Sequence, residues 1–191
     1  MVSFVRNWPP VETEPPVRHP DAPAPGTKLG QHYSRCFGCG DEQPGGLRLS
    51  ATAGEGVSLV AEFEVTEAHE GAPGLAHGGL LACAFDEALG GANAMLRLPA
   101  VTGHLQTDFR RPVPVGTRLH ITAQVDGVAG RKIYSSAAGR LNGPDGQLAL
   151  HARALFVIVD VSHFTTHGNR EQIAKLSWDQ AARDEQLDFN P

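Results

Sequence analysis

The sequence predicts an α+β domain in which one long, buried helix lies among β-strands. Two observations support this fold class. Residues 78–95 carry almost no charge, and their apolar side chains recur at helical spacing, at Leu81, Ala84, Phe85, Ala88, Leu89 and Ala92. On both sides of this helix, short runs alternate between apolar and polar residues, as strands do.

The strands fall into two groups around the helix. Before it we expect strands at 47–52 and 57–65, followed by a solvated loop over residues 66–76. After Pro99, which ends the helical region, four further strands are expected, at 101–109, 119–126, 133–141 and 147–160. A turn over residues 142–146 joins the last two strands as a hairpin.

The chain divides into one domain with two extensions. Residues 1–30 contain seven prolines and predict an extended or disordered arm. Residues 31–160 form the domain. Residues 161–191 form a C-terminal extension, in which 169–183 are expected to be a short amphipathic helix.

Composition excludes several classes of function. The net charge of −5 is mild and includes no basic patch, so neither nucleic acid nor a membrane surface is an expected partner. No apolar run reaches the roughly 20 residues that span a bilayer, and the first residues lack the apolar core of a signal peptide. Three cysteines give no even disulfide framework, which favours the reducing cytoplasm.

Two acids, Asp86 and Glu87, interrupt the apolar helix, where a carboxylate is costly unless it is paired or used. Small residues around Asp86 leave space beside it, and desolvation should raise its pKa toward that of a general base. Gly78 and Gly79 leave the N–H groups at the start of the helix bare, ready to bind an anion. A desolvated carboxylate and an anion hole are two parts of an acyl-transfer site.

The spacing of these two parts predicts a dimer. Gly78 and Asp86 lie eight residues apart, about 12 Å along one helix at ~1.5 Å per residue. One reacting carbonyl cannot contact both ends of that span. We therefore expect a symmetric homodimer, or a tetramer built as a dimer of dimers, with sites shared between chains.

The sequence resembles the hotdog-fold acyl-CoA thioesterases of the PaaI-like, thioesterase-superfamily type over residues 36–160. The resemblance rests on the segment 71–79, which ends in His77-Gly-Gly, on Asp86 nine residues after that histidine, and on the Arg-Pro-x-Pro-x-Gly segment 111–116. It implies a long central helix wrapped by a curved antiparallel sheet. It also implies an acyl-CoA substrate, hydrolysed without a cofactor.

Site roles follow from the same resemblance. Asp86 would be the general base or nucleophile, the Gly78 N–H would polarise the thioester carbonyl, and Thr102 would hold the water. His77 is expected to make a structural or substrate-orienting hydrogen bond, and Gly79 belongs to the same turn. Some branches of the family place a substrate-positioning Asn where this chain has Gly71, so that contact is missing.

Further residues are candidates for substrate binding. Glu87 is the rival of Asp86, but adjacent helix residues point about 100° apart, so only one can face the cleft. Coenzyme A carries three phosphates, and cations must bind them; the candidates are Arg110, Arg111, Arg131 and Lys132.

The segment His32–Cys39 offers a Cys-x2-Cys pair with a histidine four residues before it. These are three possible zinc ligands, whereas a closed structural site needs four, and no second cysteine pair exists. We therefore expect no metal. The two thiols would instead pack under the helix or line the acyl tunnel.

Two other functions remain open. One is a hydratase or dehydratase on the same fold, although the Asp-x4-His pair typical of such enzymes does not open this helix. The other is a non-catalytic acyl-thioester binding protein or accessory subunit, in which Asp86 serves only structure.

Overall fold

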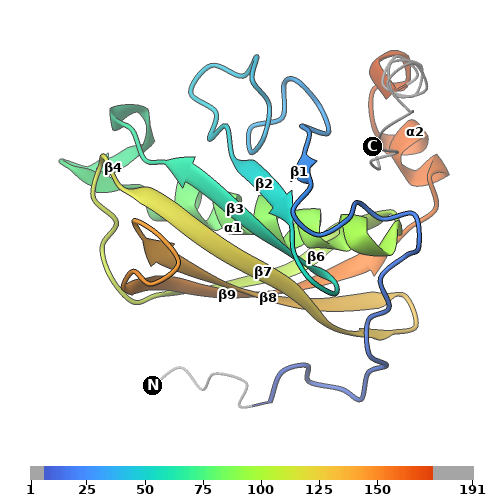
Figure 1. Cartoon of the computed structure of the whole chain (residues 1–191). Coiled ribbons are helices and arrows are strands. Elements are labelled where there is room, and N and C mark those ends of the chain that lie inside the picture. The colour runs from blue at the N-terminus through green and yellow to red at the C-terminus, as the bar shows by residue number, and fades with distance from the viewer. Residues whose placement is uncertain (1–6, 174–191) are drawn as a thin grey trace.

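A computed structural model describes residues 7–173 of the 191-residue chain. Its centre is the helix α1 (Gly78–Ala92), which lies along one face of a curved antiparallel sheet (Figure 1). This arrangement confirms the predicted fold class. The helix continues into the short 3-10 turn η2 (Asn93–Leu96) and ends before Pro99.

The sheet has seven strands, whose spatial order is β1-β2-β3-β7-β8-β9-β6. The bounds are β1 (Lys28–Leu29), β2 (Ser50–Ala53), β3 (Ser58–Glu64), β6 (Ala100–Phe109), β7 (Arg118–Ala129), β8 (Lys132–Leu141) and β9 (Leu148–Ile158). All neighbouring pairs are antiparallel. The expected strand at 47–52 is thus shorter and shifted toward Ala53, while the other strands fall where they were predicted.

The core forms where the apolar face of α1 meets the sheet. The buried residues of the helix are those of the predicted stripe, Leu81, Ala84, Phe85, Ala88, Leu89 and Ala92. Phe85 is fully buried, and its ring reaches so close to β8 that a Cβ at Gly139 would lie 2.6 Å from it. The packing therefore fixes the rotation of α1, and with it the directions of Asp86 and Glu87.

Strand β6 is the long edge strand that follows the helix. It pairs with β9 on one side only, and the register shifts between Thr102 and His104. Gly103 occupies this bulge, where the extra residue re-aims the neighbouring side chains. The other edge of β6 has no strand partner among residues 7–173.

Residues 66–76 are more ordered than the expected solvated loop. They form the turn η1 (Glu67–His69) and the small hairpin β4 (Glu70–Ala72) and β5 (Leu75–Ala76). His69 is buried against Phe63, and its carbonyl accepts a hydrogen bond from the His77 N–H. This hairpin therefore anchors the start of α1.

The extensions are described in part. Residues 7–27 run against their own domain, where Glu14 pairs with Val128 and the Trp8 indole donates to Asp126. Beyond the sheet, the short helix α2 (Ser162–His167) was not predicted. Most of the expected helix at 169–183 lies outside the described residues. No helix between residues 7 and 173 is long and apolar enough to cross a membrane.

Candidate active site

Within the described part of the chain, one backbone N–H at the start of α1 has no acceptor. His77 caps the helix, and its Nδ1 accepts the Gly79 N–H at 2.9 Å. The next two N–H groups of the helix donate to the His77 carbonyl. The Gly78 N–H has no acceptor among residues 7–173, and Gly78 is half-buried. A helix N-terminus with an N–H that has no acceptor within the chain can bind an oxyanion.

The sequence suggested that the Gly79 N–H is bare and can bind an anion. In the structure this N–H already donates to His77 Nδ1. A Cβ at Gly79 would lie 3.1 Å from the His77 ring, so glycine lets the imidazole fold back over the helix end. A Cβ at Gly71 would lie 2.7 Å from the His77 Cα. The Asn of some relatives therefore does not fit here without a shift of the turn.

Asp86 lies two turns further along α1, at the wall of a cavity of about 570 Å³. The Thr102 hydroxyl donates a 2.9 Å hydrogen bond to Asp86 Oδ1. Burial raises the pKa of Asp86, and the bond from Thr102 offsets only part of that rise. Gly90, Gly91 and Ala94 line the same cavity.

The two halves of the predicted site do not meet within one chain. Gly78 lies beside Phe109, where a Cβ on the glycine would contact the ring at 3.5 Å. Asp86 contacts Thr102, near the opposite end of β6. Gly78 and His77 are absent from the lining of the cavity that holds Asp86.

The four candidate phosphate-binding cations form two separate pairs. Arg110 and Arg111 follow the end of β6, and Arg111 donates to the Leu148 carbonyl. Arg131 and Lys132 lie at the other end of the same sheet, where Arg131 donates to the Ile158 carbonyl. Since Ile158 pairs with Ala100, nearly the whole length of β6 separates the pairs, about 30 Å at ~3.3 Å per residue.

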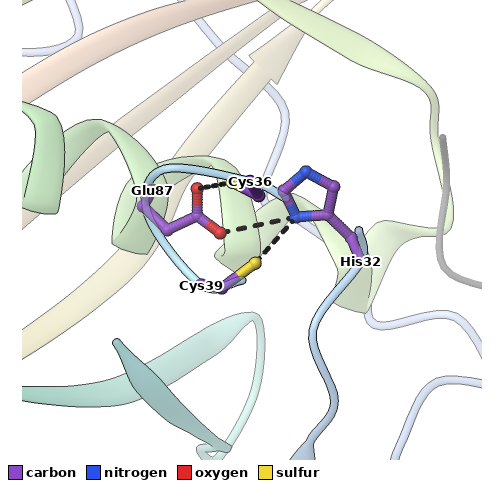
Figure 2. Close-up of side chains that lie close together, drawn as sticks. All are labelled: His32, Cys36, Cys39 and Glu87. Atoms are coloured by element: carbon purple, nitrogen blue, oxygen red, sulfur yellow. Dashed lines mark hydrogen bonds and ion pairs between the residues drawn. The ribbon is translucent and has the colours of Figure 1, made fainter. Parts of the chain in front are cut away.

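Glu87 also lines the cavity that holds Asp86, so the expectation that only one of the two adjacent acids faces it was wrong. Its carboxylate is directed toward the segment that precedes β2. There it meets His32, Cys36 and Cys39 (Figure 2). His32 Nδ1 lies 3.4 Å from Glu87 Oε1, and Cys36 Sγ lies 3.5 Å from Glu87 Oε2. The hydrogen bond with Cys39 lowers the pKa of Cys36 to about 4, and bonds to Cys36 and Glu87 raise that of His32 to about 10.

Sequence reasoning missed this cluster. It found the three residues of the loop but not Glu87, which follows Cys39 by 48 positions and comes from the helix (87 − 39 = 48). The one available signal was Glu87 itself, an acid in an apolar helix whose carboxylate needs a polar partner.

Comparisons with known proteins agree with the fold. Residues 73–142, from the β4–β5 turn to the end of β8, match the family model described as the thioesterase superfamily. The acyl-coenzyme A thioesterase THEM4 of Xenopus laevis is 32% identical over 99 residues, which cover 52% of this chain and 44% of that protein. The chain thus spans less than half the length of this curated relative.

Solved structures share the architecture. The thioesterase superfamily protein RHA08564 is 29% identical with a TM-score of 0.60, over 72% of this chain and 70% of that one. The E. coli PaaI protein of the phenylacetic acid degradation operon is 22% identical with a TM-score of 0.54, over 58% of this chain and 83% of that one. The helix wrapped by an antiparallel sheet therefore defines a hotdog-fold protein. Within that class, residues 73–142 of the chain resemble the thioesterase superfamily.

Proposed function

We propose that this chain hydrolyses acyl-coenzyme A or a closely related acyl thioester, at sites assembled from two copies of the chain. The observation that carries the proposal is the contact between Asp86 and Thr102 at the cavity wall. It places a partly desolvated carboxylate beside a hydroxyl in a space large enough for an acyl group. The name of the THEM4 relative supports the substrate class.

The chemistry needs a base or nucleophile and an oxyanion donor. Asp86 takes a proton from water, whose oxygen bonds to the thioester carbon while Thr102 helps to hold it. The C–S bond then breaks, and the leaving thiolate takes up a proton. The Gly78 N–H stabilises the negative oxygen. Asp86 can also attack the carbon directly, and water then opens the resulting anhydride.

The exposed edge of β6 supports the two-chain site. A long, unpaired strand edge is a template for a second strand, and the Phe109 side chain at its end is 52% exposed. Antiparallel pairing centred between Leu105 and Gln106 sets Thr102 opposite the partner subunit's Phe109, because both lie equally far from that centre. Gly78 of one chain then lies near Asp86 of the other.

The same pairing brings the separated cations together. Arg110 and Arg111 of one chain approach the strand end where Arg131 and Lys132 of the other chain lie. We propose that this combined group binds the phosphates of coenzyme A. A tetramer of two such dimers would keep these sites unchanged. The free thiols at Cys36, Cys39 and Cys83 fit a cytoplasmic location.

The test is thiol release from short, long and aromatic acyl-CoAs. Wild type is compared with Asp86→Asn and with Glu64→Gln, which removes an exposed carboxylate at the end of β3. We expect turnover in wild type and in the control, with a loss of roughly a hundredfold or more in Asp86→Asn. Turnover of no substrate, or equal turnover in all three proteins, would favour an acyl-thioester binding or accessory role.

A further inference from the structure

The cluster of His32, Cys36, Cys39 and Glu87 has the composition and size of a metal site. One ligand atom from each residue can be chosen so that all four lie within 4.8 Å of one another. Around a tetrahedral zinc ion, with bonds of 2.0 to 2.3 Å, neighbouring ligand atoms lie about 3.3 to 3.8 Å apart. The contact of 3.1 Å from His32 Nδ1 to Cys39 Sγ and those of 3.4 and 3.5 Å to Glu87 are close to this range.

The loop that carries the thiols is held by its own backbone. The Gly38 N–H donates to Cys36 Sγ at 3.3 Å, and the Gly40 N–H donates to the Cys36 carbonyl. The N–H groups of Leu47 and Leu49 donate to the carbonyls of Phe37 and Gly38, so the loop is tied to the chain leading into β2. These backbone bonds therefore hold the sulfur atoms of Cys36 and Cys39 close to His32 and Glu87.

Two glycines are needed for this geometry. A Cβ at Gly38 would lie 2.4 Å from Glu87 Oε2, so the loop can rest directly on the carboxylate. A Cβ at Gly40 would lie 2.3 Å from the Ser34 carbonyl oxygen, which is part of the backbone and cannot yield as a side chain does. The loop and the helix are thus fitted to each other around the four ligands (Figure 2).

The ligand set indicates which metal fits. Two thiolates with one imidazole and one carboxylate form a mixed soft and hard set that suits zinc and does not suit magnesium or calcium. Four protein ligands leave no open position for a substrate or a water, which is the pattern of a structural site. Zinc binds both cysteines as thiolates and the imidazole in its neutral form, so binding is coupled to the loss of protons from the site.

We propose that His32, Cys36, Cys39 and Glu87 bind one zinc ion, which fastens the loop 32–39 to the middle of α1. Since His32 and Glu87 also line the cavity that holds Asp86, the ion holds one wall of that cavity in place. This site is independent of the proposed hydrolysis and would serve a binding protein equally well.

The first experiment needs no variant. The full chain is expressed with zinc in the medium, purified, and its metal content is measured by inductively coupled plasma mass spectrometry. We expect about one zinc per chain, the stoichiometry of one four-ligand site, and an X-ray absorption spectrum with two sulfur and two nitrogen or oxygen neighbours. Less than a tenth of an equivalent of zinc in the chain purified with its thiols reduced would overturn the proposal.

Variants then assign the ligands. Cys36→Ser with Cys39→Ser, and Glu87→Gln alone, should lower the zinc content severalfold. Cys83→Ser is the matched control, since this thiol lies one turn before Glu87 on α1 but outside the cluster, and it should keep full zinc. Circular dichroism identifies variants that have not folded. If the double variant is unfolded, titration of metal-free wild type with Co²⁺ decides, since the absence of thiolate-to-cobalt absorption would contradict the site.

Discussion

The Thr102 hydroxyl and the Asp86 carboxylate form a 2.9 Å hydrogen bond that joins the middle of α1 to the start of β6. The bond uses one carboxylate oxygen and leaves Oδ2 without a hydrogen-bond partner among residues 7–173. The bulge at Gly103 lies directly after Thr102, and such an irregularity re-aims the neighbouring side chains. The contact therefore depends on both the helix rotation and the strand irregularity.

Replacing Thr102 should separate this contact from general packing. Thr102→Val keeps the shape of the side chain but removes the hydroxyl, so kcat should fall by roughly tenfold or more while KM changes little. Thr102→Ser keeps a hydroxyl and should recover most of the lost activity. Steady-state kinetics on one acyl-CoA measure both, and equal activity of valine and serine variants would contradict the role.

Gly78 offers a test of the oxyanion donor. Gly78 is the first residue of α1, a position that accepts proline, and His77 already has the extended conformation that precedes proline. Gly78→Pro removes the N–H and should lower kcat by about a hundredfold to a thousandfold.

The control for that variant is Gly78→Ala. Its added Cβ meets only Phe109, at an ordinary contact distance of 3.5 Å, and its N–H remains. It should keep activity within a few-fold of wild type. Similar losses in the alanine and proline variants would show that the backbone N–H is not what matters.

The buried stripe of α1 should dominate stability. Phe85→Ala removes a fully buried ring between α1 and the sheet and should cost about 3 to 5 kcal/mol of unfolding free energy. Phe85→Leu keeps more of the volume and should cost less. Urea unfolding followed by circular dichroism measures both, and a cost below about 1 kcal/mol for alanine would contradict the packing.

The two cation pairs should contribute to binding of the coenzyme A phosphates and not to the chemical step. Arg131→Ala with Lys132→Ala should raise KM for an acyl-CoA severalfold and leave kcat nearly unchanged. The same acyl group on N-acetylcysteamine, which has no phosphates, is the control substrate and should show no change. An equal rise in KM for both substrates would assign the pair to structure.

The sequence predicted those parts of the molecule that depend on local patterning. The helical spacing of Leu81, Phe85 and Leu89 identified the buried face of α1, and alternation identified most strands. The site motif singled out Asp86 as a candidate because its neighbours on the helix are small and it follows His77 by nine residues. The residues that give these signals lie within a few turns of one helix, so the helical period alone fixes their relative directions.

Features that depend on distant contacts were not predictable in this way. The partner of Glu87 lies about 50 residues earlier in the chain, in a loop without periodicity. The use of the Gly79 N–H by His77 depends on a side-chain rotation that no spacing reveals. The two cation pairs have similar side chains but lie at opposite ends of β6. Only the order of the strands in the sheet shows this separation.

The most direct test of a hydrolytic site shared between chains is complementation. Asp86→Asn and Gly78→Pro proteins are each assayed alone, then mixed in equal amounts, allowed to exchange subunits, and assayed again for thiol release. Half of the random dimers are mixed, and each mixed dimer contains one intact site of its two, so about a quarter of wild-type activity should return.

Native mass spectrometry of an isotope-labelled mixture confirms that exchange took place. Restored activity in the exchanged mixture would establish that Gly78 of one chain works with Asp86 of the other. If mixed dimers form and the activity stays at the level of the separate variants, the site does not combine these two residues across chains.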